Sequence, residues 1–405
     1  MDRIRQIIHL DLDAFFCAVE ELRDPSLIGK PFAVGGQPNE RGVVASCSYA
    51  ARAYGIHSAM PMSQALRLFP RLIIISSRHR HYEEASQKVM AILRELTPLV
   101  EQISIDEAFL DVTEISEEAE VIARRLQARI KAETGLPCSI GVATSKLVAK
   151  IATDVGKKAK RGSGPPFALT IVPPGSEAEF LAPLPADFLW GVGPKTSVRL
   201  AELGIQTIGD MAAYPEYELA AKFGKNGKEM IRHARGIDQS PIVTSYPTKS
   251  ISQEITFARD IKNEVELRKT LLDMAGRVSS HLQEDNLSGT TIKLKLRWPN
   301  FTTITRQSTL SQMTDDAEMI AGIAQQLFEK VWKPGKAVRL LGVGISGLAP
   351  SVHQLSIWDV ENPQTERLNE AIHELEGRFG EGIIIRGLPA QNTGNPLTSI
   401  KPKRS

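Results

Sequence analysis

The 405-residue chain has only three cysteines, Cys17, Cys47 and Cys138, and they are widely separated. They are too few for a disulfide framework or a cysteine metal cluster, and they fit a reducing, cytoplasmic location. No run of 18 or more apolar residues occurs, which excludes a membrane span. The start of the chain has no secretory pattern, because acidic residues soon interrupt its apolar stretch. The 49 basic and 47 acidic residues leave a net charge of +2, which neither indicates nor excludes nucleic acid.

The remaining composition is ordinary for a globular protein, with 42 % hydrophobic and 24 % charged residues. At roughly 100–200 residues per domain, the length predicts two to four domains. Helix-breaking clusters at 162–166 and 241–247 predict boundaries near residues 166 and 240. Residues 391–405 are polar and rich in Pro, Gly and Lys, which predicts a disordered tail.

Apolar periodicity predicts a mixed α+β fold. Residues 7–13 alternate as a strand does, and residues 100–112 are typical of two short strands with Asp106 and Glu107 near their junction. Residues 118–133 and 264–283 have the pattern of amphipathic helices. Residues 291–297 alternate strictly, which predicts another strand. Because these elements form no regular βαβ series, the fold class is α+β.

Acidic residues follow two of these strands: Asp11 and Asp13 end the first, and Asp106 and Glu107 follow another. One interpretation is structural, since strand ends often carry acids where they leave the core. If the strands are neighbours, however, three carboxylates converge and repel one another unless a cation neutralises them. Ligand sets made only of oxygen favour Mg²⁺. Two such ions about 3.5–4 Å apart can activate a hydroxyl and stabilise a leaving pyrophosphate.

The residues around these acids resemble the motifs of Y-family DNA polymerases, the lesion-bypass enzymes. The resemblance rests on segments 9–20, 43–52, 104–107 and 146–154, and it runs in order from about residue 5 to about residue 348. Within the family, the motifs are most similar to those of the bacterial DNA polymerase IV group.

The resemblance implies that Asp11, Asp106 and Glu107 hold two Mg²⁺, with the backbone carbonyl of Leu12 as a further ligand. Glu107 would lie nearest the primer 3′-hydroxyl, and Asp13 resembles a supporting residue. The implied nucleotide-binding residues are Phe15, Phe16, Ser46, Tyr49, Arg52 and Lys157. Of these, Tyr49, Arg52 and Lys157 would bind the β- and γ-phosphates, which suits a phenol, a guanidinium fork and an ammonium group. The alternative for Tyr49 and Arg52 is a helix-start turn with a surface pair.

Phe16 resembles the family's steric gate, a ring that admits deoxyribose and clashes with a 2′-hydroxyl. The alternative is core packing beside Phe15. The small residues Ala45, Ser58 and Ala59 would leave a roomy pocket over the nascent pair, which predicts tolerance of damaged templates.

Three later features predict contact with DNA. Residues 190–205 resemble a helix-hairpin-helix, in which Gly191, Gly193 and Lys195 would meet a phosphate. A basic stripe of Lys293, Lys295 and Arg297, with Thr291, forms the polar face of one strand. Residues 298–303 resemble the central turn of the family's C-terminal DNA-binding domain. The alternatives are an ordinary helix–helix turn and a solvated strand face.

The resemblance also implies a right-hand architecture. Its expected parts are a palm (1–18 and 78–166), fingers (19–77), a thumb (167–240), a little finger (245–348) and a C-terminal tail (349–405). In the tail, Gln354, Leu355, Ile357 and Trp358 belong to a pentapeptide similar to the Gln-Leu-x-Leu-Phe motif that docks on the sliding clamp. The alternative is that this segment packs on its own domain. Residues 362–379 are typical of one further helix.

We therefore expect a template-directed, low-fidelity DNA polymerase that acts in translesion synthesis and lacks a proofreading exonuclease. Its partners would be primer-template DNA, deoxynucleoside triphosphates and a sliding clamp, and it is expected to be a monomer. Two alternatives are another two-metal nucleotidyl enzyme, such as a cyclase, and a non-catalytic DNA-binding scaffold. The DNA-holding features disfavour the first, and the complete set of acids disfavours the second.

Overall fold

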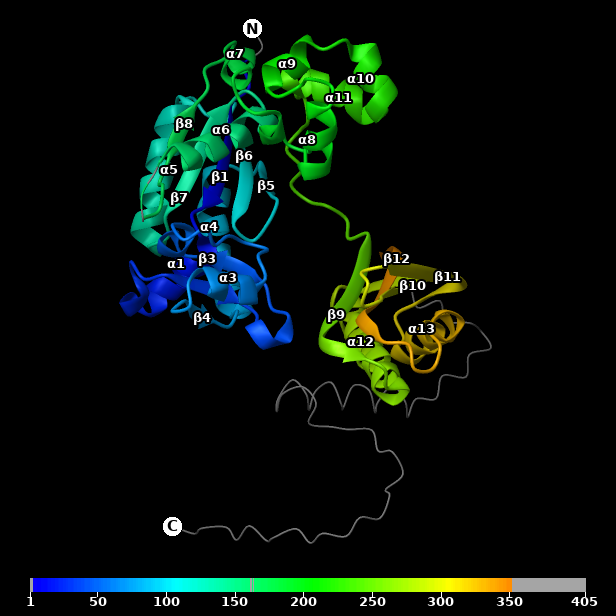
Figure 1. Cartoon of the computed structure of the whole chain (residues 1–405). Helices are drawn as coiled ribbons and strands as arrows, with labels where there is room; N and C mark the ends of the chain where they lie inside the picture. Colours follow the sequence, from blue (N-terminus) through cyan, green and yellow to red (C-terminus); the bar gives the residue numbers. More distant parts are fainter. Residues whose placement is uncertain (1–2, 161, 163, 352–405) are drawn as a thin grey trace, which may run out of the picture. The chain divides into compact units, whose positions relative to one another are not determined.

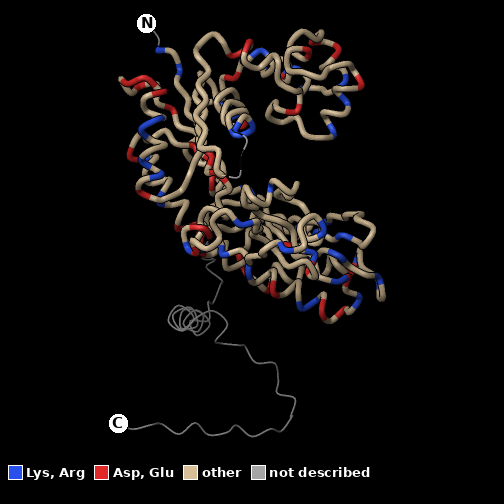
Figure 2. Tube along the Cα trace, turned by 60° about the vertical axis from the view of Figure 1, so that its left-hand side comes forward, with Lys and Arg blue, Asp and Glu red and all other residues tan. Residues whose placement is uncertain are grey.

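The computed structural model describes residues 3–160, 162 and 164–351. This part of the chain contains a five-stranded, a three-stranded and a four-stranded sheet, each with its own helices (Figure 1). The predicted α+β class is therefore confirmed. Acidic and basic residues are interspersed over the described parts (Figure 2), in keeping with the small net charge of +2. No helix in this part of the chain is long and apolar enough to cross a membrane.

The five-stranded sheet has the order β5-β6-β1-β7-β8. Its strands are β1 (Ile7–Leu12), β5 (Val100–Gln102), β6 (Glu107–Asp111), β7 (Cys138–Ala143) and β8 (Leu169–Ile171). The strand predicted at 7–13 and the two short strands predicted within 100–112 are confirmed. β1 lies in the middle, antiparallel to both β6 and β7. β8 pairs parallel with β7, so the sheet continues past the boundary predicted near residue 166.

The two faces of this sheet pack against different helices, because successive β1 side chains point to opposite sides. Ile8, Leu10 and Leu12 share a core with helices α1 (Phe15–Arg23), α4 (His79–Leu96) and α5 (Ala119–Thr134). Ile7 belongs to a second core with the apolar side of α6 (Lys146–Ala159). His9 and Asp11 share the face of Ile7, so they point toward α6.

Gly141 of β7 lets α6 approach the sheet closely. It lies beside His9 in the β1–β7 register. A Cβ atom there would lie 2.1 Å from the carbonyl oxygen of Ala149 and 2.7 Å from Oγ1 of Thr153, both in α6. Only a residue without a side chain permits this packing.

The three-stranded sheet, order β3-β2-β4, has a separate small core. Its elements are η1 (Pro25–Leu27), β2 (Phe32–Gly35), η2 (Pro38–Glu40), β3 (Val44–Cys47), α2 (Tyr49–Arg52), α3 (Met62–Leu68) and β4 (Ile73–Ile75). Ser48 caps α2, because its hydroxyl accepts a hydrogen bond from the N–H of Ala51.

An all-helical segment follows β8. It comprises α7 (Glu177–Leu181), η3 (Ala186–Phe188), α8 (Pro194–Ala201), α9 (Ile208–Ala213), α10 (Glu216–Phe223) and α11 (Lys225–Ala234). Gly191, at a φ of 93°, turns the chain into α8, and Pro194 occupies the first helical position, where its missing N–H costs nothing.

The four-stranded sheet has the order β11-β10-β12-β9, with two helices on one face. Its elements are β9 (Ser250–Ile261), α12 (Glu264–Glu284), β10 (Leu287–Arg297), β11 (Thr303–Thr314), α13 (Ala317–Val331) and β12 (Val338–Pro350). Ile292, Leu294 and Leu296 of β10 are buried in its core, as the predicted alternation requires. The predicted clamp peptide at 354–358, the helix at 362–379 and the tail at 391–405 lie outside the described residues.

Replacing Gly141 with Ala should lower the free energy of unfolding by roughly 1–3 kcal/mol, because α6 must move away from the sheet. Urea denaturation measures the loss. Gly164→Ala is the control, since no atom lies within 4 Å of the added Cβ. Equal stability of Gly141→Ala and the natural chain would contradict the close packing of α6.

Candidate active site

The end of β1 brings several acids together through the sheet register. Asp11 lies opposite Glu107 of β6, and the N–H of Leu12 donates to the carbonyl oxygen of Asp106 at 3.0 Å. The chain then turns sharply into α1 through Ala14, whose φ of 46° is left-handed and uncommon for a residue other than glycine. These hydrogen bonds and this turn place Asp11, Asp106 and Glu107 at one edge of the sheet.

Lysines of α6 neutralise these acids. Lys157 Nζ lies 2.5 Å from Asp11 Oδ1 and 3.6 Å from Asp13 Oδ1, and Lys150 forms an ion pair with Glu107. Lys146, at the start of the same helix, contacts the buried Glu101 of β5 at 2.8 Å. Positions 146, 150 and 157 share one face of a helix, so α6 presents a row of ammonium groups to the sheet.

Glu107 is held in its ionised form. Burial alone would raise the pKa of Glu107, but His9 and Lys150 outweigh it and lower the pKa to about 2. His9 Nε2 lies 2.7 Å from Glu107 Oε1, and His9 Nδ1 lies 2.8 Å from Thr153 Oγ1. Burial lowers the pKa of His9, which leaves its ring neutral near pH 7.

Asp106 and Asp13 shift the other way. Burial raises the pKa of Asp106, and the charges of Asp11 and Glu107 raise it further, whereas a hydrogen bond from Ser104 at 2.6 Å opposes the shift. Burial also raises the pKa of Asp13, which accepts hydrogen bonds from Ser139 Oγ and the N–H of Phe167. Both carboxylate oxygens of Asp13 are thus tied into the fold.

Among the described residues, no three His, Cys, Asp or Glu side chains form a ready-made metal site. The donor set nevertheless fits a hard divalent cation, because it consists of carboxylate oxygens and the Leu12 carbonyl. The mutual repulsion at Asp106 also marks a place where added positive charge is favourable. Lys157 and Lys150 supply part of that charge in this structure.

Tyr49 and Arg52 lie on the short helix α2. The Arg52 guanidinium stacks 4.5 Å from the centre of the Tyr49 ring. Burial, with the charge of Asp13, raises the pKa of Tyr49, so its phenol stays a hydrogen-bond donor. A cavity of about 260 Å³ is lined by both Asp13 and Tyr49. Ser46 lies apart from this group, buried with its hydroxyl accepting from the Cys17 thiol.

Phe15 and Phe16 have different surroundings. Phe15 is buried in the core below the sheet, whereas Phe16 is partly exposed. The Phe16 ring stacks on that of Tyr82 at 4.2 Å, and the Tyr82 hydroxyl donates to the buried Glu20 at 2.7 Å. The stacked Tyr82 ring therefore fixes the orientation of the Phe16 ring.

The predicted DNA contacts lie on two other elements. Gly193 is the N-cap of α8, where the first helical N–H groups have no intrahelical partner, and the exposed Lys195 follows. On β10, Lys293, Lys295 and Arg297 lie on the face opposite the apolar core. Lys295 forms an ion pair with Glu254 at 2.6 Å, and Arg297 donates to Thr303 at 2.8 Å.

Known proteins share this arrangement along the chain. Residues 10–154 match the impB/mucB/samB family, residues 248–357 match the C-terminal domain of that family, and residues 187–238 match the thumb domain of DNA polymerase iota. The DNA polymerase IV of Desulfatibacillum aliphaticivorans is 40 % identical over 93 % of this chain and 95 % of its own. That of Streptomyces coelicolor is 43 % identical over 85 % of this chain and 71 % of its own. A solved Y-family DNA polymerase chimera, Dbh-Dpo4(243-245)-Dbh, covers 85 % of this chain and 100 % of its own, with a TM-score of 0.75 at 25 % identity.

This chain belongs to the Y family of DNA polymerases. It is a DNA-directed DNA polymerase, and it therefore binds primer-template DNA and nucleotides. The right-hand fold that the sequence predicted is confirmed, including the helical thumb. Enzymes of this family depend on a divalent metal.

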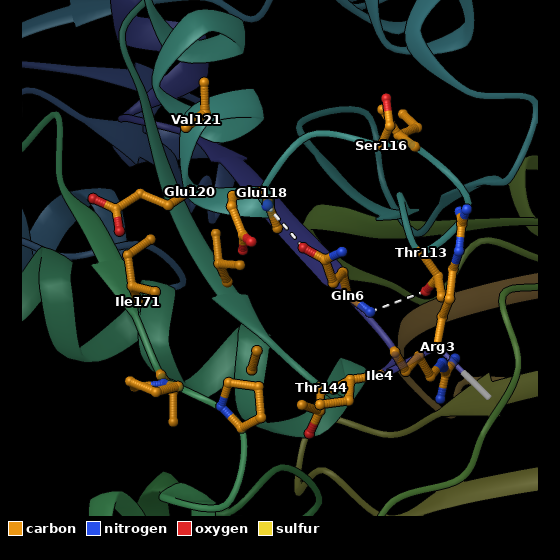
Figure 3. Close-up of a pocket in the computed structure, with 18 of the residues that line it drawn as sticks. Arg3, Ile4, Gln6, Thr113, Ser116, Glu118, Glu120, Val121, Thr144 and Ile171 are labelled. Atoms are coloured by element: carbon orange, nitrogen blue, oxygen red, sulfur yellow. Dashed lines mark hydrogen bonds between the residues drawn. The ribbon is translucent and has the colours of Figure 1, made fainter. Parts of the chain in front are cut away.

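One cavity of this Y-family polymerase lies away from the carboxylates. It measures about 810 Å³ and lies where β1 begins, among residues such as Ile4, Gln6 and Thr144 (Figure 3). The side-chain oxygen of Gln6 accepts a hydrogen bond from the backbone N–H of Ala119, and the backbone N–H of Gln6 donates to the Thr113 hydroxyl (Figure 3). Gln6, which directly precedes β1, and Asp11 are five residues apart along the chain, which is roughly 16 Å at 3.3 Å per residue.

Sequence reasoning missed two polar residues that contact Glu107, namely His9 and Lys150. Each had a signal. His9 is a polar residue in the apolar run Ile7 to Leu10, and Lys150 is spaced for one helix face with Lys157. The signal was incomplete, because neither pattern says which carboxylate lies opposite.

The free energy of unfolding at acid pH should depend on Glu107. A carboxyl group with a folded-state pKa of about 2, below its ordinary 4.5, stabilises the fold above pH 4.5 and loses that contribution as the pH falls toward 2. In Glu107→Gln the contribution is absent at every pH. The difference in unfolding free energy between the natural chain and Glu107→Gln should therefore shrink from pH 4.5 downward, as measured by urea denaturation in chelator. A difference that stays constant would show that Glu107 is not held ionised.

Proposed function

We propose that this Y-family polymerase extends a primer by a two-Mg²⁺ mechanism in which Asp11, Asp106 and Glu107, with the Leu12 carbonyl, hold the metal ions. The observation that supports this most is the β1–β6 register, which sets Asp11 opposite Glu107 with Asp106 one residue away. Bound Mg²⁺ would activate the primer hydroxyl and stabilise the charge on the leaving pyrophosphate.

The chain's own residues prepare this edge of the sheet. His9 and Lys150 keep Glu107 ionised, so its carboxylate is ready to receive positive charge near the primer 3′-hydroxyl. Lys157 pairs with Asp11, and its mobile ammonium group would transfer to the β- and γ-phosphates when nucleotide binds. Tyr49 and Arg52 would hold the same phosphates from the other side. The expected reaction is in-line attack of the 3′-hydroxyl on the α-phosphorus, with pyrophosphate leaving.

Phe16 would exclude ribonucleotides, because its ring is fixed on Tyr82 and cannot yield easily to a 2′-hydroxyl. Phe15 would support it from the core, and Ser46 would act indirectly, since it is buried. Ala45, Ser58 and Ala59 are small and exposed, which supports a roomy site with weak checking of base-pair shape. Low fidelity and translesion synthesis are the expected result. The enzyme would also lack a proofreading exonuclease, because each described sheet and helical segment has another proposed role.

The proposed division keeps the five-stranded sheet as palm and the three-stranded sheet as fingers. The helices of 167–240 would be the thumb, and the four-stranded sheet the little finger. DNA would be held at the start of α8 (Gly191, Gly193, Lys195) and on β10 (Lys293, Lys295, Arg297), where basic side chains and backbone N–H groups suit phosphates. Docking of 354–358 on a sliding clamp, action as a monomer and a cytoplasmic location remain predictions from the sequence.

Removing the two carboxylates of β6 and its entry turn tests the proposal. Asp106→Ala with Glu107→Ala should reduce primer extension with Mg²⁺ and deoxynucleotides by more than about a thousandfold, because two of the three carboxylate ligands are lost. Glu114→Ala, at an exposed ion pair with Arg3, is the control and should act at the natural rate. Full-speed incorporation by the double variant would overturn the mechanism.

The steric gate has its own test. Phe16→Ala should raise the use of ribonucleotides relative to deoxynucleotides by roughly 10–200-fold, the range expected for a steric contact. Tyr82→Phe is the matched control, since it keeps the stacked ring and loses only the hydroxyl that donates to Glu20. Unchanged exclusion of ribonucleotides by Phe16→Ala would remove the gate from Phe16.

A further inference from the structure

We propose that His9 is a positioning residue for catalysis: it fixes the Glu107 carboxylate through one oxygen so that the other faces the reacting groups. The inference rests on the proposed role of Glu107 in binding the metal ions. It concerns a residue that would touch neither substrate nor metal.

The geometry around the His9 ring leaves it little freedom. The side chain is fully buried in β1 and packs 4.7 Å from the Phe109 ring of β6. Its Nε2 lies 2.7 Å from Glu107 Oε1 and its Nδ1 lies 2.8 Å from Thr153 Oγ1. Both ring nitrogens are therefore engaged, one by the sheet and one by α6.

The roles of the two nitrogens follow from their partners. An ionised carboxylate can only accept, so Nε2 carries the hydrogen and donates to Glu107. The carboxylate therefore sets the ring tautomer, and Nδ1 can accept from the Thr153 hydroxyl at 2.8 Å. That hydroxyl also lies 3.1 Å from the carbonyl oxygen of Ala149, so Thr153 joins the imidazole to α6.

Gly141 makes this contact possible. It lies beside His9 in the register, and a Cβ on it would meet Thr153 Oγ1 at 2.7 Å. The missing side chain brings the Thr153 hydroxyl down to the imidazole. The sequence thus provides three residues, on β1, β7 and α6, for one hydrogen bond to Glu107.

Glu107 is bound in an asymmetric way. His9 and Lys150 both contact Oε1, one through a directional ring N–H and the other through a mobile ammonium group. Lys150 supplies charge, but only the planar, buried ring fixes the plane of the carboxylate. Oε2 is thereby oriented for a metal ion or for the primer hydroxyl.

The test compares His9→Phe, which keeps a ring of similar size and loses both hydrogen bonds, with His9→Gln, which keeps an N–H donor. Mn²⁺ affinity is measured by electron paramagnetic resonance, on the full chain with primer-template and a non-hydrolysable deoxynucleotide. Single-turnover incorporation is measured in parallel. His9→Phe should weaken Mn²⁺ binding and slow incorporation by about 10–100-fold, and His9→Gln should restore most of both. Nucleotide affinity and the melting temperature of His9→Gln should stay near those of the natural chain.

Two controls separate positioning from folding. His281→Phe changes an exposed histidine on α12 and should leave every readout unchanged. Thr153→Val has nearly the shape of Thr153 but lacks the hydroxyl, so it should reproduce part of the loss, whereas Thr153→Ser should not. If His9→Phe fails to fold, the Thr153 pair decides the question.

The inference is overturned if folded His9→Phe binds Mn²⁺ and incorporates nucleotide within about twofold of the natural chain. It is also overturned if His9→Gln loses as much as His9→Phe, or if Thr153→Val behaves like Thr153→Ser. Failure of the proposed function looks different, because the Asp106→Ala and Glu107→Ala double variant would then remain active.

Discussion

The repulsion between carboxylates at the end of β1 is the constraint on which the rest of the structure depends. Asp11, Asp106 and Glu107 lie at one sheet edge, and the charges of the other two help to raise the pKa of Asp106. Such a cluster is costly unless cations compensate it. Helix α6 provides the compensation through Lys150 and Lys157, and these ion pairs stabilise the fold around the carboxylates.

This requirement explains several features that look unrelated in the sequence. α6 must lie close to the sheet, which needs Gly141 without a side chain. The chain must leave β1 abruptly so that Asp13 and the aromatic pair stay near Asp11, which needs the left-handed turn at Ala14. His9 must be polar within an apolar strand, because it links α6 to Glu107. The geometry of the carboxylate cluster and the packing of the five-stranded sheet are therefore set by the same few contacts.

Much of this could be predicted from the sequence, because the relevant patterns are local. Alternation of apolar and polar residues predicted β1 and β10, and helical periodicity predicted α5 and α12. Acidic residues at two strand ends predicted the carboxylate cluster. The pairing of Lys150 with Glu107 could not be predicted, since it depends on the position at which α6 packs along the sheet. The same holds for β8, which joins the sheet after a Pro-Gly segment that is typical of a domain boundary. The buried place of Ser46 depends on its contact with Cys17 of α1, which the motif around Ser46 does not reveal.

A crystal structure of the complex with primer-template, an unreactive deoxynucleotide and Mg²⁺ tests the central claim most directly. We expect two Mg²⁺ ions bound by Asp11, Asp106 and Glu107. Lys157 should have moved from Asp11 to the triphosphate, while Lys150 and His9 should still contact Glu107 Oε1. Metal ions bound elsewhere, or Lys157 still paired with Asp11 beside a fully bound nucleotide, would contradict the account.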